Sequence, residues 1–493
     1  MEESVSQEHL DPTGEITLET VKARAVKGVI VLTGRTFLLQ LLSFGAWFLL
    51  SVFLDAKEIG LFFIVSAVVN FFRYFSDIGL AGALIQKKEE VKEIDLRTTF
   101  TVQQILVLLI LILLYFLSPL LKRYYSLSFE GLLLLYALGA SFLFSSLKTI
   151  PSILLERKLD FGKLVIPDVL ENLFYNFSAV AFAWLGFGIR SFTYAVLIRA
   201  VVGLIAIYVI KPWRPAFAFS KESLKKLLTF GIPYQLNSFL ATIKDDGMTA
   251  FLGGILGPTG LGYLAWAQKW AQTPLRLFMD NVLRVTFPAF SRMQDDREQL
   301  ARSVTRSIFF VCFLVFPSVA ALIVLAPLLL KIVPRYSKWE PALIPLILVS
   351  INVIFAAATT QLTNLLNAIG KIKITFKLMI MWTVLTWAFI PYLAIKYSVN
   401  GAALGYALVG ASSIVAIIIT RGYVKFSLWE GVLKPAFATL LMAVVIYLAK
   451  GYLPIHLYSV FTLCIIGGIV YFISVYIMTK GTILADAKKV FRP

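Results

Sequence analysis

Long apolar runs, separated by short clusters of charged residues, glycine and proline, recur along almost the whole chain of 493 residues. A helix that crosses the core of a bilayer needs about 20 mainly apolar residues. The pattern therefore predicts an all-α integral membrane protein with about fourteen transmembrane helices. We place the helices at residues 28–54, 59–84, 99–121, 131–153, 165–187, 190–210, 230–256, 260–287, 307–333, 341–367, 374–396, 400–420, 434–449 and 457–478.

Composition supports this class. Hydrophobic residues make up 59% of the chain and charged residues only 15%, whereas soluble domains have about 25% charged residues. A soluble enzyme, a disulfide-stabilised secreted protein and a disordered chain are therefore excluded. Two cysteines, Cys312 and Cys464, and two histidines, His9 and His456, are too few for a disulfide framework or a usual zinc site. We expect no metal and no cofactor.

The net charge of +18 would suggest nucleic acid in a soluble protein. In a multispanning membrane protein, Lys and Arg collect in cytoplasmic loops instead. With the N-terminus inside, about 31 of these residues fall on the inner side and about 9 on the outer side. We therefore expect both termini in the cytoplasm and no nucleic-acid partner. The acidic first 20 residues do not resemble a cleavable signal peptide.

Three local matches recur at an offset of about 200–212 residues, roughly the length of six spans with their loops. One of them relates Tyr194-Ala195 to Tyr406-Ala407. A repeat of an even number of spans keeps its orientation, so we expect two pseudo-symmetric six-helix lobes with a substrate cleft between them, followed by two C-terminal helices. The expected domains are a tail (1–27), a first lobe (28–210), a linker (211–229), a second lobe (230–422), spans 13 and 14 (423–480) and a C-terminal tail (481–493). Within the linker, residues 220–228 are typical of an amphipathic helix on the membrane surface, with Ser220 as its cap.

Charged residues inside the bilayer are costly, so they are candidates for function. The expected cavity ligands are Arg35, Arg73, Arg199, Lys244, Lys269, Gln272 and Arg276. Helical spacing groups polar residues on shared faces, as in Lys269, Gln272, Arg276 and Asp280, in Asn237 and Lys244, and in Asp168, Glu171, Asn172 and Tyr175. Six of the candidate ligands are cations, which predicts an anionic substrate, and the planar fork of Arg suits phosphate.

Other interpretations of these residues are purely structural. Arg73 and Asp77 are four residues apart and could neutralise each other, as could Arg276 and Asp280. Arg35 and Asp168 lie near the cytoplasmic end of their spans, where their charges could reach the interface. The acidic residues Asp168, Glu171, Asp245 and Asp246 could also bind a coupling proton or Na⁺.

No catalytic arrangement is visible in the sequence. There is no phosphate-binding loop of the ATPase kind and no pair of loop carboxylates suited to glycosyl transfer. A polysaccharide polymerase or ligase would also need a large outer loop, and every predicted outer loop is short. We therefore expect no enzyme and no catalytic residues.

Two stretches resemble a known family. The segment FLDAKEIGLFFIVSAVVNFFRYFSDIGLAGALIQKKE, which begins at Phe53, is similar to Wzx-type bacterial polysaccharide flippases of the colanic-acid and teichuronic-acid exporter branch. Its most specific part is Asp77-Ile78-Gly79-Leu80. The segments LGPTGLGYLAWAQKWAQTPLRLF and FPAFSRMQDD of the second lobe resemble the same branch.

The resemblance implies membership of the multidrug/oligosaccharidyl-lipid/polysaccharide superfamily. It further implies a rocking carrier in the bacterial cytoplasmic membrane that flips undecaprenyl-diphosphate-linked oligosaccharides for surface polysaccharide synthesis. Its partners would be this substrate, membrane lipid and the polymerase or chain-length machinery of the pathway. The alternative is a cation-coupled multidrug exporter of the same superfamily, for which we expect a net acidic cavity.

Overall fold

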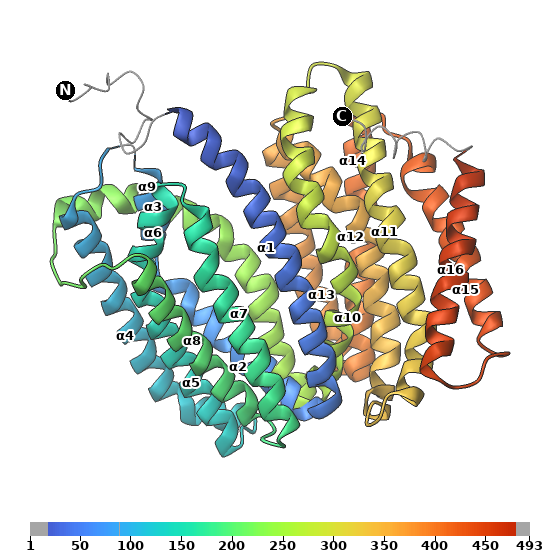
Figure 1. Ribbon diagram of the computed structural model, residues 1–493, viewed down its shortest axis with the longest axis horizontal. Helices are drawn as coiled ribbons and strands as arrows, with labels where there is room; N and C mark the ends of the chain where they lie inside the picture. The colour runs from blue at the N-terminus through green and yellow to red at the C-terminus, as the bar shows by residue number, and fades with distance from the viewer. Residues whose placement is uncertain (1–17, 88, 480–493) are drawn as a thin grey trace. The chain divides into compact units, whose positions relative to one another are not determined.

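The computed structural model describes residues 18–87 and 89–479, except for the side chains of residues 18–33, 230, 232–238, 240, 280 and 281. Every regular element in these residues is a helix (Figure 1), as expected. The chain forms two compact units that divide between Thr259 and Gly260. The predicted lobe boundaries remain predictions. The C-terminal tail, most of the N-terminal tail and the side chains of Asn237 and Asp280 lie outside the described part.

The first unit is built from the following helices: α1 (Leu18–Phe53), α2 (Ala56–Arg73), η2 (Tyr74–Ser76), α3 (Leu80–Gln86), α4 (Glu93–Tyr124), α5 (Phe129–Leu147), α6 (Thr149–Arg157), α7 (Phe161–Trp184), α8 (Arg190–Ile210), α9 (Lys221–Thr242) and the π-helix η3 (Ile243–Gly247). Helix α7 packs along α8 and α1, while α5 packs against α2, α4 and α8 (Figure 1). This packing surrounds the cavity described below.

The predicted span 59–84 is not one helix. Helix α2 ends at Arg73, and α3 begins at Leu80 after a turn in which Gly79 has a φ of 78°. The Oδ1 atom of Asp77 accepts a hydrogen bond from the backbone N–H of Ala81 at 3.0 Å and so caps α3. A Cβ atom at Gly79 would overlap the backbone of Gly231 in α9. A helix long enough to span the membrane is present at Ala56–Ser76, but its predicted end at residue 84 was wrong, because the left-handed turn at Gly79 separates it from α3.

The predicted span 131–153 is likewise divided, at Lys148, into α5 and α6. At the end of α6, the buried side chain of Arg157 donates hydrogen bonds to the carbonyl oxygens of Leu84 at 2.7 Å and Lys87 at 2.8 Å. These carbonyls belong to the C-terminal end of α3, which has no intrahelical partners for them. Arg157 therefore holds α3 in place.

The predicted surface helix at 220–228 is the beginning of the longer helix α9. Ser220 caps it as expected, since its Oγ atom accepts from the N–H of Ser223 at 3.3 Å. Ser223 in turn donates to Asp95 at 2.5 Å, and Lys87 pairs with the same carboxylate at 2.6 Å. The start of α9 is thus fastened to α3 and α4.

Helix α10 (Met248–Arg292) begins in the first unit and is interrupted at Gly257, whose φ is 65°. The break falls between the predicted spans 230–256 and 260–287. The rest of the second unit consists of α11 (Arg297–Ile332), η4 (Ser337–Ala342), α12 (Leu343–Ala368), α13 (Ile372–Ala411), α14 (Ile414–Tyr423), η5 (Trp429–Leu433), α15 (Lys434–Ala449) and α16 (Leu457–Met478). The last two coincide with the predicted spans 434–449 and 457–478.

Eleven helices of the described residues are long and apolar enough to cross a membrane. The segment Ile372–Tyr423 counts once among them although it contains two predicted spans, separated at Ser398 with a φ of 54°. Helices α7 and α9, which carry charged residues, are not among the eleven. Large apolar side chains face outward, such as Phe116, which is 74% exposed, and Val209, which is 77% exposed. The protein is a multi-pass membrane protein.

Candidate functional site

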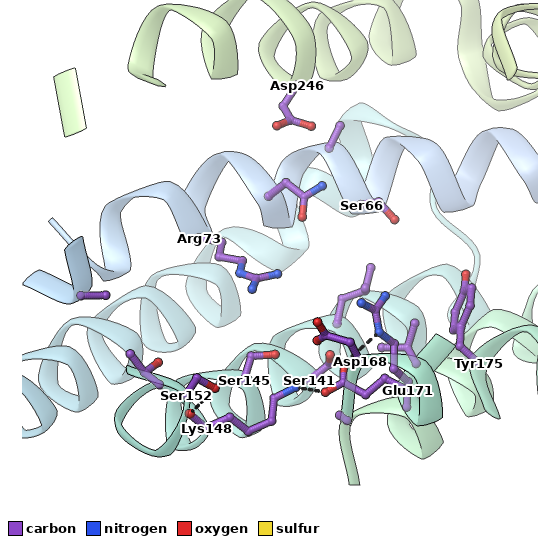
Figure 2. A pocket seen from close by; sticks show the side chains of 18 of the residues that line it. Ser66, Arg73, Ser141, Ser145, Lys148, Ser152, Asp168, Glu171, Tyr175 and Asp246 are labelled. Atoms are coloured by element: carbon purple, nitrogen blue, oxygen red, sulfur yellow. Dashed lines mark hydrogen bonds and ion pairs between the residues drawn. The ribbon is translucent and has the colours of Figure 1, made fainter. Parts of the chain in front are cut away.

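A cavity of about 800 Å³ lies within the first unit. Its size falls in the usual range of ligand pockets. Polar side chains come from five regions of the chain: Ser66, Asn70 and Arg73 in α2; Ser141, Ser145, Lys148, Thr149, Ser152 and Glu156 in α5, α6 and their junction; Asp168, Glu171 and Tyr175 in α7; Arg199 in α8; and Asp245, Asp246 and Thr249 in η3 and α10. Figure 2 shows Arg73 and Ser66 on α2, between Asp246 on one side and the Lys148–Glu171 pair on the other.

Helical periodicity explains how single helices contribute whole rows of these side chains. Ser66, Asn70 and Arg73 are four and three residues apart, which places them on one face of α2. Asp168, Glu171 and Tyr175 follow the same spacing in α7, where the sequence predicted a shared face. In the structure Asp168, Glu171 and Tyr175 line the cavity, whereas Asn172, the fourth residue of the predicted face, is not part of its lining.

Glu171 is the centre of an ion-pair network. Its carboxylate accepts from Lys148 Nζ and, at 3.3 Å, from Arg199 Nε. The side chain of Glu171 is only 9% exposed. A Cβ atom on Gly203 in α8 would overlap the Glu171 carboxylate, so a glycine at this position lets the carboxylate lie against α8. The guanidinium group of Arg199 also lies 5.7 Å from the centre of the Tyr175 ring, within the range of a cation–π contact.

Two further candidate cations are also paired. Arg35 Nη2 lies 2.9 Å from Asp168 Oδ2, and Lys244 Nζ lies 3.6 Å from Asp245 Oδ1. Neither Arg35 nor Lys244 is part of the cavity lining, although each holds a carboxylate that is. Arg35 therefore has a structural role, because its ion pair with Asp168 joins α1 to α7.

Arg73 differs from these cations. Its side chain reaches the cavity, and no ion pair to it is found among the described residues. The expected alternative, a pair with Asp77, is not formed because Asp77 caps α3. Two lining carboxyl groups, those of Glu156 and Asp246, also have no Lys or Arg partner in the described part of the chain. Asn70 lines the same cavity as Asp246.

The lining is therefore not cationic. It contains three cations, Arg73, Lys148 and Arg199, and five carboxyl groups, Glu156, Asp168, Glu171, Asp245 and Asp246. Arg35 and Lys244 do not line the cavity but form ion pairs with lining carboxylates. With these two included, the number of cations equals the number of carboxyl groups. The expectation of a cationic cavity does not hold for this unit, because most of the candidate cations are already neutralised.

A second cavity of about 450 Å³ shares Asn70, Arg73, Ser145 and Thr149 with the first. Its other polar lining residues are Tyr74, Ser76, Asp77, Gln103, Ser146 and Thr242. Gln103 is 5% exposed, and its Nε2 atom donates to Thr149 at 3.1 Å. Arg73 consequently lies where the two cavities adjoin.

The remaining predicted ligands, Lys269, Gln272 and Arg276, belong to the second unit. Arg276 Nη2 donates to Gln272 Oε1 at 3.2 Å, which confirms that these two share a helix face. Their place in a substrate site stays a prediction. No cluster of three or more His, Cys, Asp or Glu suited to a metal ion occurs among the described residues.

Sequence reasoning missed Lys148, which the loop-charge argument assigned to the cytoplasmic side. It also missed Glu156 and Asn70. A signal was present, because Ser141, Ser145, Lys148 and Ser152 are spaced by four, three and four residues, the same polar stripe that identified the other faces. The stripe continues through the bend at Lys148 into α6, so all four side chains line the cavity.

Comparison with known proteins now gives the family. A family model described as polysaccharide biosynthesis protein matches residues 49–344. This chain belongs to that family. The matched region contains every residue that lines the two cavities. The family expected from the Asp77-Ile78-Gly79-Leu80 motif is confirmed.

Two relatives match this chain over most of its length. It is 25% identical to the succinoglycan biosynthesis transport protein ExoT of Rhizobium meliloti, with 81% of each chain covered. It is 24% identical to the lipopolysaccharide biosynthesis protein WzxC of Escherichia coli, with 72% of each chain covered. Its fold is similar to that of the lipid II flippase MurJ in an inward closed conformation, with a TM-score of 0.76 and 18% identity over 92% of this chain and 100% of that one.

Proposed function

We propose that this protein flips lipid-linked oligosaccharides, carried on undecaprenyl diphosphate, across the cytoplasmic membrane of a bacterium for the synthesis of a surface polysaccharide. The observation that carries the proposal is a polar cavity of about 800 Å³ inside a unit whose helices expose apolar side chains. A headgroup can enter such a cavity while its polyprenyl chain stays in lipid. The relatives named above are described as proteins of polysaccharide biosynthesis, one of them as a transport protein.

Arg73 is the diphosphate ligand that the geometry favours in this unit. A cation already bound to a carboxylate gains less from a phosphate, because the existing pair must be broken first. Arg35, Arg199 and Lys244 are in that position, whereas Arg73 reaches the cavity without an ion pair among the described residues. Lys269, Gln272 and Arg276 are the proposed ligands of the second unit.

The carrier works by alternating access between two states, and the substrate shifts their populations only by its difference in affinity for them. Of the candidate coupling residues, Asp168, Glu171 and Asp245 are held by cations. Asp246 is the remaining candidate for a coupling proton or Na⁺. In this proposal both termini lie in the cytoplasm. The polymerase or chain-length machinery of the pathway is a further partner.

A second candidate, a cation-coupled multidrug exporter, is favoured by one observation. Five carboxyl groups outnumber three cations in the cavity lining, and an acidic lining was the expected mark of a drug exporter. Three of those carboxylates are paired with cations, which leaves Glu156 and Asp246 against Arg73. The remaining imbalance is too small to attract an organic cation strongly.

Headgroup translocation in proteoliposomes tests the proposal. A labelled undecaprenyl-diphosphate oligosaccharide is supplied with and without a pH gradient, a Na⁺ gradient and a membrane potential. We expect protein-dependent flipping, abolished in Arg73→Ala and partly retained in Arg73→Lys, which keeps the charge but not the planar fork. Glu90→Gln, an exposed change outside both cavities, is the control. Uptake of a cationic dye without any flipping would instead establish the drug exporter.

A further inference from the structure

The two adjoining cavities have a polar lining that a diphosphate on Arg73 accounts for only in part. Apart from Arg73, Lys148 and Arg199, their polar lining consists of carboxyl, hydroxyl and amide groups. A carboxylate only accepts hydrogen bonds, and so does a phosphate oxygen. The two lining carboxyl groups without a Lys or Arg partner among the described residues, those of Glu156 and Asp246, therefore favour a ligand that donates hydrogen bonds.

Two further oxygens of the lining lack a hydrogen-bond donor. The Oγ atom of Ser66 and the Oε1 atom of Gln103 are buried and have no hydrogen-bond partner in the described part of the molecule. A buried polar atom without a partner costs about 1–3 kcal/mol. The side chains of both residues line the cavities, Ser66 the larger and Gln103 the smaller, and Arg73 lines both.

The donor that fits is uncharged. An ammonium group would meet Arg73, Lys148 and Arg199 in the same space, and three of the five carboxylates are already neutralised by cations. A hydroxyl group both donates and accepts, so it can pair with a carboxylate, with Ser66 or with either end of the Gln103 amide. Apolar ring faces are also present, since Phe63 and Tyr175 line the larger cavity.

We propose that these two cavities are a sugar-binding site in which Asp246, Asn70, Ser66 and Gln103 bind the hydroxyl groups of uncharged sugars, while Arg73 between them binds the diphosphate. The inference rests on the proposed function, since it divides the headgroup of that substrate between named residues. Asn70 of α2 and Asp246 of η3 line the same cavity, and the two elements pack against each other. The amide and carboxyl groups offer a donor and acceptors to the hydroxyls of a ligand in this cavity.

The test separates the sugar from the phosphate. Binding to the purified full-length protein in nanodiscs is measured for bare undecaprenyl diphosphate and for the same lipid carrying glucose, galactose or N-acetylglucosamine. We expect at least one glycosylated lipid to bind about tenfold more tightly than the bare lipid, a ratio worth about 1.4 kcal/mol. Asp246→Asn, Asn70→Ala and Gln103→Leu should reduce this ratio to below about threefold while leaving the affinity for the bare lipid unchanged.

Arg73→Ala should lower the affinity for the bare lipid and for the glycosylated lipids by the same factor. Glu90→Gln should change neither affinity. Each variant is first compared with the wild type by size-exclusion profile, and Ser66→Ala provides a mild change should a larger one misfold. The inference is overturned when no glycosylated lipid exceeds the bare lipid, or when the Asp246 and Asn70 variants weaken both equally. Binding of ethidium that Asp246→Asn abolishes would overturn it too, because the site would then take cations.

These outcomes are distinguishable from a failure of the proposed function. Sugar-dependent binding without any flipping in proteoliposomes would leave the sugar site established and the flippase proposal rejected. Flipping with equal affinity for bare and glycosylated lipids would support the flippase proposal and reject the sugar site.

Discussion

At the scale of single residues, the first unit is organised around Glu171. Its buried carboxylate holds Lys148 from the α5–α6 junction and Arg199 from α8. One acidic side chain thereby joins three segments that are distant in the sequence. Removing the charge of Glu171 would leave the two cations close together without their partner. The free energy lost in this way is larger than the net stabilisation that the intact ion pair provides.

Glu171→Gln is therefore expected to lower the free energy of unfolding by about 3 kcal/mol. The melting temperature of the detergent-solubilised protein measures this. Asp168→Asn, one turn earlier in α7, is the matched control. Its pair with Arg35 is more exposed, at 40% and 28%, so its removal should cost less than about 1 kcal/mol. Equal losses in the two variants would contradict the central role of Glu171.

Gly203 permits this arrangement, because a side chain there would displace the Glu171 carboxylate. Gly203→Ala should destabilise the protein by about 2 kcal/mol through the loosened charged hydrogen bonds. In Gly203→Ala combined with Glu171→Gln the two losses should not add, since both act on one contact. Gly45→Ala in α1, where a Cβ atom meets open space, should be neutral or slightly stabilising. Additive losses in the double variant would show that Gly203 acts independently of Glu171.

At the scale of secondary structure, the decisive feature is the break between α2 and α3. Asp77 caps α3, Gly79 supplies the left-handed turn and Gly231 of α9 packs directly on it. Asp77 and Gly79 belong to the motif that carried the family resemblance. The motif therefore encodes a backbone junction that turns α2 away from α3 at the point where Arg73 enters the cavities.

Gly79→Ala should prevent formation of a stable protein, because its Cβ atom meets backbone atoms that no side-chain rotation can relieve. The control is Gly186→Ala. Gly186 also has a positive φ, of 83°, but a Cβ atom there has open space, so only the left-handed conformation costs energy, about 1–2 kcal/mol. Size-exclusion profiles of the membrane-extracted proteins compare the two. Similar behaviour of both variants would show that the contact with Gly231 is unimportant.

At the scale of the whole molecule, the distribution of Lys and Arg predicts the orientation in the membrane. The chain has two cysteines, Cys312 and Cys464, so a cysteine-free background needs only Cys312→Ala and Cys464→Ser. In it, Tyr452→Cys between α15 and α16 should react with an impermeant maleimide in whole cells. Lys425→Cys between α14 and η5 should react only after lysis. The opposite labelling would place both termini outside the cytoplasm.

The sequence by itself determined the features that depend on local periodicity, namely the ends of several helices and the residues that share a helix face. Apolar length sets the spans, so α8, α15 and α16 begin and end where the sequence predicts. Helical spacing also placed Asp168, Glu171 and Tyr175 on one face, because side chains three or four residues apart must share a face of a helix. The cap of α9 at Ser220 follows from its residue type. Each of these features depends only on neighbours within about two turns.

Tertiary structure decided which charges meet. Lys148 resembles a loop lysine in the sequence, and only the packing of α5, α7 and α8 brings it to Glu171. The pairs Arg35–Asp168 and Lys148–Glu171 depend on distances between helices far apart in the chain, which no local pattern contains. For the same reason the cations inside the predicted spans suggested a cationic cavity, whereas in the folded first unit Arg35, Arg199 and Lys244 are paired with carboxylates. Among the described residues, Arg73 lines the cavity without an ion pair. The breaks at Gly79 and Lys148 were hidden as well, because the energy that selects them comes from contacts with α9 and α7.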